Sequence, residues 1–288
     1  MGMARKPTLL RRVTAVALEA GRRCLADYSH PKSPRRYTQP QLLACLVLKA
    51  YLKQTYRGII EILQESDGLR EALDLTQDHI PRHTTLEEFA SRLGGAEVID
   101  QIVAECLKID GRPVTDLATD STGLQSSAAS AHYLSRTGKK GGHYLKLSLA
   151  VACMSILLVG FVVSRGPSHD LQEAKALDWR SASRVRPLRI YKDAGYDSEW
   201  SHIFWREGCS ASSFIPPFAR GSAGVIKSPF RSQMAKQGMP LCYGKRWHAE
   251  SFISGLKRST GDKLLGKTHA SQSVEAALRL LAYQCRRI

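Results

Sequence analysis

Three acidic residues occur in sequence contexts that favour metal ligation. Asp120 ends the run PVTDLATD, Asp193 ends the run PLRIYKD, and Glu250 lies in the segment YGKRWHAESFISGLK. We expect each aspartate at the end of a strand, where the edge of a buried sheet presents side chains to a cleft. Carboxylate oxygens are ligands that Mg²⁺ prefers, and two such ions about 3.5–4 Å apart promote in-line displacement at a phosphodiester. The sequence therefore predicts a two-metal site formed by these three carboxylates.

The segment around Glu250 also carries cations at helical spacing. Tyr243 and Arg246 precede Glu250 by seven and four residues, and Lys257 follows it by seven. A continuous helix would place all four side chains on one face. Arg246 would then grip a phosphate with its forked donors, and Lys257 would act as a point charge. Taken alone, the spacing also fits a solvated helix surface with intrahelical ion pairs.

These residues resemble the motifs of a known family. Tyr243, Arg246, Glu250 and Lys257 reproduce the Y-x2-R-x3-E-x6-K signature of bacterial insertion-sequence transposases of the DDE class, in the large group named for families four and five. The run from Asp193 to Tyr196 is similar to that group's D-x-G-x-[FY] motif. The triplet Asp120-Ser121-Thr122 is similar to its first aspartate motif. The resemblance extends from about Tyr56 to the end of the chain.

The resemblance implies a transposase that binds the terminal inverted repeats of its element, cleaves DNA and joins the freed end to target DNA. It implies that Asp120, Asp193 and Glu250 hold two Mg²⁺ ions, for which Mn²⁺ can substitute. It further implies double-stranded DNA as partner, both element ends and target, and a homodimer in the DNA complex. Two alternatives stay open: a ribonuclease H-like nuclease that never joins strands, and an inactive DNA-binding protein from a decayed element.

The charge balance also favours a polyanionic partner. Lys and Arg total 42 against 26 Asp and Glu, which gives a net charge of +16. The stretch 208–249 contains basic residues and no acidic one. We expect DNA contacts from Tyr243, Arg246, Lys257, Lys245, Arg231 and Lys227. A basic ribosomal or membrane-surface protein would show a similar balance, so charge alone does not decide.

Two further basic stretches favour nonspecific attraction to phosphates. Residues 1–40 form a basic arm, and Arg136, Lys139 and Lys140 lie among glycines and small residues. The basic arm is equally consistent with a solvated, partly disordered segment, and the stretch 208–249 is also consistent with a flexible basic surface loop.

Cysteine spacing and hydropathy bear on the compartment. Seven cysteines occur without a C-x2-C pair, which is typical of reduced packing residues and of a cytoplasmic, here nucleoid-associated, protein. The apolar stretch 145–164 is long enough for a membrane span, but its alternation and β-branched residues favour two antiparallel strands. We therefore expect no membrane partner.

The order of patterns predicts an α/β protein with two domains. Residues 1–110 are expected to form a small all-α region with the basic arm, for DNA-end binding or dimerisation, and residues 111–288 a ribonuclease H-like mixed-sheet catalytic domain. The expected strands and helices of the second domain are 114–120, a hairpin over 143–163, 171–181, 188–193, 198–206, 213–215 and a final helix carrying Glu250. In the first domain we expect helices over 9–23, from Pro40, over 85–93 with a capping box of Thr84 and Glu87, and over 97–107.

Other polar residues near these motifs are interpreted as structural. Asp116 and Glu199 lie close to the expected ligands, and Asp197 is placed to cap the following helix. Trp247 is expected to pack, and His248 is expected at the surface or at the rim of the DNA.

Overall fold

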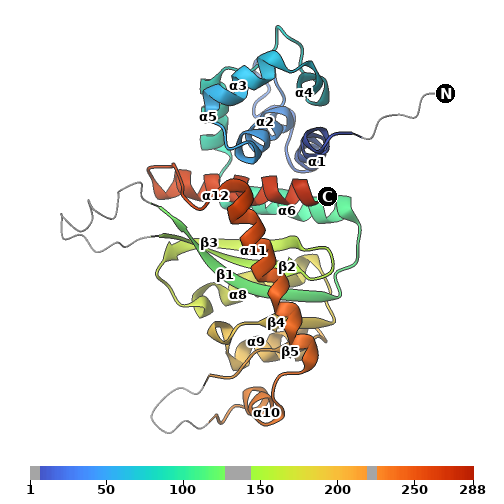
Figure 1. Cartoon of the computed structure of the whole chain (residues 1–288), viewed down its shortest axis with the longest axis vertical. Coiled ribbons are helices and arrows are strands. Elements are labelled where there is room, and N and C mark those ends of the chain that lie inside the picture. The colour runs from blue at the N-terminus through green and yellow to red at the C-terminus, as the bar shows by residue number, and fades with distance from the viewer. Residues whose placement is uncertain (1–6, 127–143, 219–225) are drawn as a thin grey trace, which may run out of the picture. The chain divides into compact units, whose positions relative to one another are not determined.

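The computed structural model describes residues 7–126, 144–218 and 226–288 (Figure 1). The chain forms two compact units. The helical unit comprises Met1–Gly111, Leu256–Asp262 and Gly266–Ile288, and the sheet unit comprises Arg112–Gly255 and Lys263–Leu265.

The helical unit contains only helices among its described elements. They are α1 (Leu9–Cys24), α2 (Gln39–Tyr51), α3 (Tyr56–Glu65), α4 (Asp67–Ala72), α5 (His83–Arg92), α6 (Ala96–Asp110) and α12 (His269–Arg287). Helix α2 is apolar nearly all round and buried; α1 and α12 pack against it and against each other, and α6 packs against α1 and α12. Helix α12 was not among the elements expected from the sequence.

The helix starts follow local capping chemistry. Helix α2 carries Pro40 in its first turn, as predicted, and Thr38 and Gln41 form a capping box there that was not predicted. The capping box predicted at Thr84 is wrong: α5 begins at His83, two residues before the predicted start, and its N-cap residue Arg82 makes no side-chain cap.

The sheet unit is built on five strands, β1 (Asp116–Gln125), β2 (Tyr144–Ala152), β3 (Leu157–Gly166), β4 (Arg189–Lys192) and β5 (Ser212–Phe214). Their order across the sheet is β3-β2-β1-β4-β5. Strand β2 runs antiparallel to β1 and β3, whereas β1, β4 and β5 are parallel. This mixed sheet with its helices confirms the predicted α/β, ribonuclease H-like fold class.

Strand β1 is longer than predicted. It continues to Gln125, so that Asp120 lies in mid-strand rather than at the strand's end. The continuation pairs with β2 from Asp120↔Leu149 to Gln125↔Tyr144. The residues after Asp120 are mostly polar, so the sequence did not predict that the strand continues. Pairing with the long neighbouring strand β2, rather than apolar content, extends β1.

The apolar stretch 145–164 lies in strands β2 and β3, whose inner residues are buried. In the described parts of the chain, no helix is long and apolar enough to cross a membrane.

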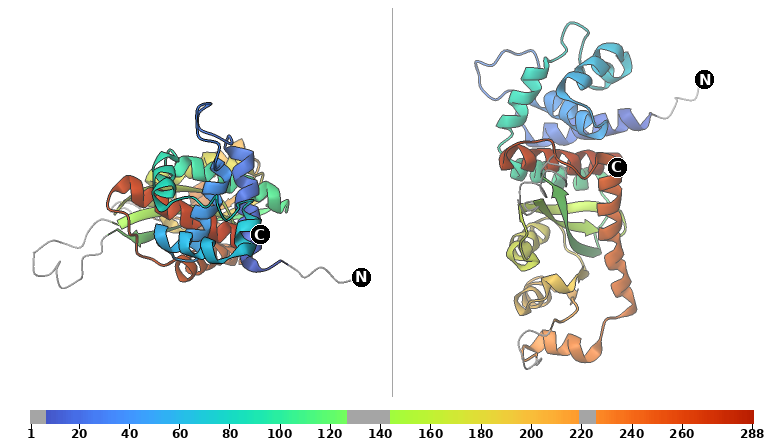
Figure 2. Two further views of the ribbon diagram at one scale, coloured as in Figure 1. Left: turned by 90° about the horizontal axis from the view of Figure 1, so that it is seen from above. Right: turned by 60° about the vertical axis from the view of Figure 1, so that its left-hand side comes forward.

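Helices lie on both faces of the sheet. The helical elements of this unit are α8 (Asp170–Arg184), the 3-10 turn η1 (Ala194–Tyr196), α9 (Glu199–Ile203), the π turn η2 (Phe204–Gly208), α10 (Pro229–Gln237), the 3-10 turn η3 (Leu241–Arg246) and the start of α11 (Trp247–Thr260). Figure 2 shows α8 and α9 on one side of the sheet and α11 on the other. Helix α10 was not expected, and the helix expected over 198–206 divides into α9 and η2.

Candidate active site

Asp120 is held on the sheet face opposite to that of its neighbour Ser121, because side chains alternate along a strand. The Ser121 amide donates a hydrogen bond to Asp120 Oδ1 at 2.8 Å. The side chain is 18% exposed. Burial raises the pKa of Asp120, and the charges of Asp193 and Glu250 raise it further, while the Ser121 hydrogen bond and Arg246 lower it.

Asp193 reaches the same place from the neighbouring strand. Thr119 of β1 is paired in parallel with Lys192 of β4, so the residues that follow them, Asp120 and Asp193, are neighbours where this pairing ends. Asp193 is also the N-cap residue of η1, and the Tyr196 amide donates to its carbonyl at 3.0 Å. Strand β4 ends at Lys192, so that Asp193 directly follows a strand, as predicted.

Glu250 joins these aspartates through Arg246. Glu250 lies in the first turn of α11, and Arg246 Nη2 donates to its Oε1 at 2.5 Å. Arg246 Nη1 lies 3.8 Å from Asp120 Oδ2. The guanidinium is thus shared by carboxylates from a strand and a helix that are 130 residues apart in the chain. It offsets part of the repulsion between them.

The donor set suits a hard divalent cation. Three carboxylates face one guanidinium, so the cluster retains an excess of negative charge, and its oxygens are the ligand type of Mg²⁺. Within the described residues, no group of three His, Cys, Asp or Glu side chains is already arranged around a metal position. Arg246 shows that the cluster accommodates a positive charge.

Tyr243 does not belong to the helix that carries Glu250, contrary to the predicted continuous helix. It lies in η3, and α11 begins at Trp247. Gly244 within this turn disfavours α-helix. The Tyr243 hydroxyl donates to the Lys192 carbonyl at 3.0 Å. Burial raises the pKa of Tyr243 to about 12.

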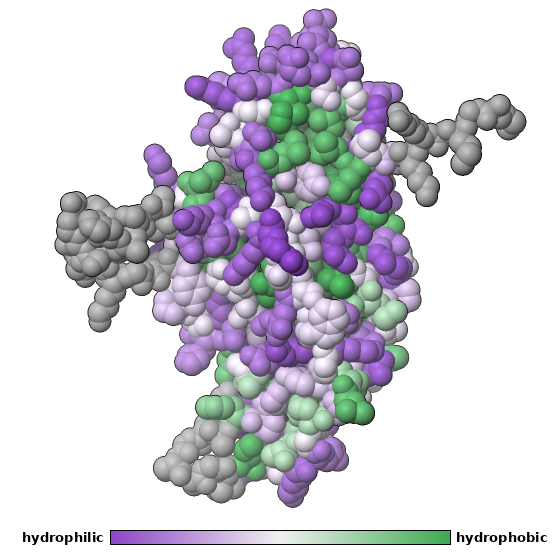
Figure 3. All heavy atoms as spheres, viewed as in Figure 1, coloured by the Kyte–Doolittle hydropathy of each residue, from purple (hydrophilic) through white to green (hydrophobic). Residues whose placement is uncertain are grey.

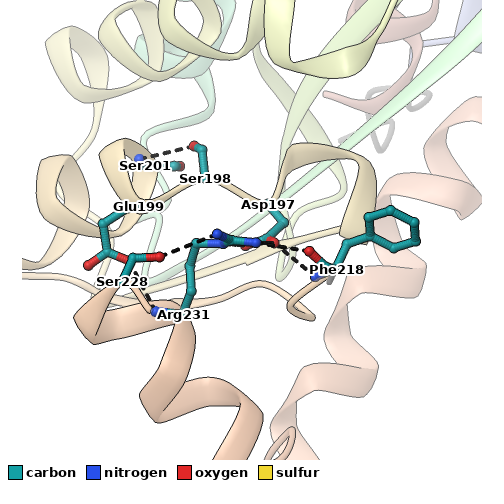
Figure 4. Close-up of polar contacts among 7 residues, drawn as sticks. All are labelled: Asp197, Ser198, Glu199, Ser201, Phe218, Ser228 and Arg231. Carbon is teal, nitrogen blue, oxygen red and sulfur yellow. Dashed lines mark hydrogen bonds and ion pairs between the residues drawn. The ribbon is translucent and has the colours of Figure 1, made fainter. Parts of the chain in front are cut away.

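Arg231 contacts a buried carboxylate rather than solvent. Its guanidinium donates to both oxygens of Asp197, at 2.7–2.9 Å, and to the Phe218 carbonyl (Figure 4). Glu199 accepts hydrogen bonds from the Phe230 and Arg231 amides at the start of α10. The N-cap of α9 is Ser198, not Asp197, which binds Arg231 instead. Direct contact of Arg231 with a phosphate would compete with this ion pair.

The other predicted DNA contacts differ in their surroundings. Lys245 Nζ lies 3.1 Å from Asp116 Oδ2. Asp116 is buried and also accepts hydrogen bonds from Arg189 and Tyr191, so it anchors Lys245 within the protein. Lys227 is exposed, and Lys257 lies in α11, two helical turns after Glu250. The basic residues Arg136, Lys139 and Lys140 lie outside the described residues.

The surface of the sheet unit is mainly polar on the side that α11 occupies. On the face drawn in Figure 3, apolar side chains of this unit form small separate groups among hydrophilic ones. The exposed large apolar side chains include Trp247, which follows Arg246 and stacks on His248 with ring centroids 4.3 Å apart. Trp247 is 54% exposed, so its exposure does not support the predicted packing role.

Sequence reasoning missed two buried charge networks beside the site. Lys192 is fully buried and contacts Asp178 at 2.5 Å and Ser201 at 2.9 Å. Lys146, also buried, lies between Asp170 and Glu173. The sequence contains one sign of these networks, a lysine at an inward position of each apolar strand. A buried charge of this kind needs a partner.

Comparison with known proteins identifies the domain. The family described as Transposase DDE domain matches residues 114–285, a range that includes Asp120, Asp193 and Glu250. The chain belongs to this family of DDE transposases. No curated protein matches the transposase. A cryo-EM structure of a piggyBac transposase synaptic complex with hairpin DNA matches it at 10% identity and a TM-score of 0.44, over 97% of this chain and 72% of that chain. The narrower insertion-sequence group implied by the Tyr243 to Lys257 signature stays a prediction.

Proposed function

We propose that this transposase uses Asp120, Asp193 and Glu250 to hold two Mg²⁺ ions, or Mn²⁺ in their place, and with them cleaves DNA at the ends of its element and joins the freed 3′ hydroxyl to target DNA. One observation supports this proposal above the others. Asp120 of β1, Asp193 directly after the neighbouring parallel strand β4, and Glu250 of α11 interact with Arg246 within a DDE domain.

The bound ions would supply activation of the attacking oxygen and stabilisation of the leaving one. The protein's own residues have other tasks. Arg246 keeps Asp120 and Glu250 close in spite of their like charges. Tyr243 fixes the end of β4, from which Asp193 projects. Lys257 and Lys227 would attract DNA phosphates as point charges.

The proposed partners are double-stranded element ends and target DNA, bound by a homodimer in the cell's cytoplasm, at the nucleoid. The net charge of +16 supports attraction to DNA in general. We assign end binding or dimerisation to residues 1–110 and catalysis to residues 111–288, as the sequence pattern predicts.

A strand-transfer assay tests the proposal. The full-length protein is incubated with pre-cut element ends bearing a free 3′ hydroxyl, a supercoiled target and Mg²⁺. We expect the wild-type protein to form joined product and Glu250→Gln to form none. Cleavage of uncut ends without any joining would favour a nuclease of the same fold. DNA binding with neither reaction, in Mg²⁺ or Mn²⁺, would favour an inactive DNA-binding protein.

A further inference from the structure

A buried lysine organises the sheet face behind the three carboxylates. Lys146 of β2 is 3% exposed, and its Nζ lies 2.9 Å from Asp170 Oδ1 and 3.0 Å from Glu173 Oε2. It also donates to the Ser168 carbonyl at 2.8 Å, while the Ser168 hydroxyl donates to Glu173. Both acids belong to the first turn of α8, where the helix dipole favours negative charge.

Asp170 makes two contacts that Glu173 does not make. Its Oδ1 accepts a hydrogen bond from the Ser121 hydroxyl at 2.7 Å, and Ser121 follows Asp120 in β1. Its Oδ2 occupies the space where a side chain on Gly195 would begin. Gly195 lies in η1, two residues after Asp193. One carboxylate therefore contacts the segments that follow both aspartates of the proposed site.

The requirement for glycine at position 195 comes from this contact. The φ angle of Gly195 is not in the left-handed region, so backbone conformation does not demand glycine here. A methyl group at this position would overlap Asp170 Oδ2. That oxygen cannot turn away freely, because Ser121 and Lys146 hold the other oxygen of the same carboxylate.

We propose that Asp170 is a positioning residue that sets the separation of Asp120 and Asp193, by binding Ser121 on one side and packing against Gly195 on the other. This inference rests on the proposed metal-dependent function. Residues that orient metal ligands from outside the coordination sphere typically change metal affinity by about 10- to 100-fold when they are removed. Glu173 shares Lys146 and the helix turn with Asp170 but contacts neither segment, so it provides the matched control.

The test measures Mn²⁺ affinity of the full-length protein without DNA, by electron paramagnetic resonance titration, in wild type, Asp170→Ala, Asp170→Asn and Glu173→Gln. Asp120→Asn identifies the signal of the proposed site. We expect about 10- to 100-fold weaker binding in Asp170→Ala, recovery to within about threefold in Asp170→Asn, which keeps an acceptor for Ser121, and little change in Glu173→Gln. Urea unfolding of each variant checks that a folded protein is being compared.

A second pair of variants tests the Gly195 contact. Gly195→Ala is expected to weaken Mn²⁺ binding alone, and to add little in the Asp170→Ala background, because the overlap has been removed. Equal affinities of wild type and Asp170→Ala, or additive effects of the two substitutions, would overturn the inference while leaving the proposed function standing. If wild type binds no Mn²⁺ that Asp120→Asn abolishes, the proposed function and this inference fail together. Should Asp170→Ala not fold, the comparison of Gly195→Ala with Glu173→Gln still decides: weaker Mn²⁺ binding in Gly195→Ala supports the inference, and equal binding overturns it.

Discussion

The Tyr243 hydroxyl donates a hydrogen bond to the backbone carbonyl of Lys192, at 3.0 Å, one residue before Asp193. The phenol therefore ties the turn that precedes α11 to the end of β4. Tyr243 belongs to the family signature, and this contact gives it a structural task within the protein, separate from any contact with DNA.

Tyr243→Phe removes this hydrogen bond and keeps the ring. We expect the cleavage rate to fall by about fivefold, since a typical hydrogen bond contributes about 1 kcal/mol, with the Kd for element-end DNA unchanged. Cleavage rates measured at saturating protein, and Kd values measured by electrophoretic mobility shift, separate an effect on cleavage from an effect on DNA binding. A weaker Kd with an unchanged rate would instead assign the hydroxyl to DNA.

The proposed ligands make a stronger prediction. Asp120→Asn and Glu250→Gln keep side-chain size and lose the ligand charge, so we expect cleavage and joining to fall by at least about 10³-fold while DNA binding stays within about twofold. Single-turnover cleavage and a binding titration measure both. Asp116→Asn is not a suitable control, because Asp116 anchors Lys245 and Arg189. Glu207→Gln is a suitable control, because Glu207 is exposed.

The sequence was sufficient for what depends on local pattern. Alternation and β-branched residues predict β2 and β3, and the apolar run before Asp193 predicts β4, because most side chains of a buried strand are apolar. It failed where a partner far along the chain decides. The end of β1 is set by pairing with β2, and α10 is fixed by Glu199 and Asp197.

The same limit applies to the site. Asp120, Asp193 and Glu250 could be proposed from residue types and motif spacing. The internal partners of Tyr243 and Arg231 could not, because a hydroxyl or guanidinium in the sequence does not reveal whether it meets protein or DNA.

The buried pair beside Asp193 predicts asymmetric effects on stability. Lys192→Met leaves Asp178 charged and unpaired in the interior, so the free energy of unfolding should fall by about 3–5 kcal/mol. The double variant Lys192→Met/Asp178→Leu removes both charges and should recover most of that loss. Urea unfolding measures the three proteins. A double variant less stable than Lys192→Met would contradict this interpretation.

Two basic residues predicted to bind DNA should behave differently. Arg231→Ala removes the guanidinium that neutralises the fully buried Asp197 and should lower the free energy of unfolding by about 3–5 kcal/mol, with little change in the salt dependence of DNA binding. Lys227→Ala, on an exposed residue, should leave stability within about 0.5 kcal/mol and reduce the slope of log K against log salt by about 0.9. Arg231→Ala with native stability and a reduced slope would show that Arg231 binds phosphate instead.

His202 predicts a pH dependence of stability. Burial lowers the pKa of His202 from its ordinary value to about 4, and Nδ1 lies 2.7 Å from Ser213 Oγ. Between the folded and unfolded pKa values the unfolded chain binds the extra proton, so stability falls as pH falls through this window. The contribution lost between about pH 7.5 and about pH 5 is about 2 kcal/mol. Urea unfolding across this range should show a shallower decline in His202→Gln, and equal declines would contradict the assignment.

The mid-strand position of Asp120 has a genetic consequence. Its carboxylate faces Arg246 only because β1 keeps one alignment with β2 and β4. Loss of a single codon upstream within this strand would turn Asp120 toward α8 and bring a neighbour forward in its place. Copies of such an element could thus become immobile through a three-nucleotide deletion that spares the reading frame and every motif letter.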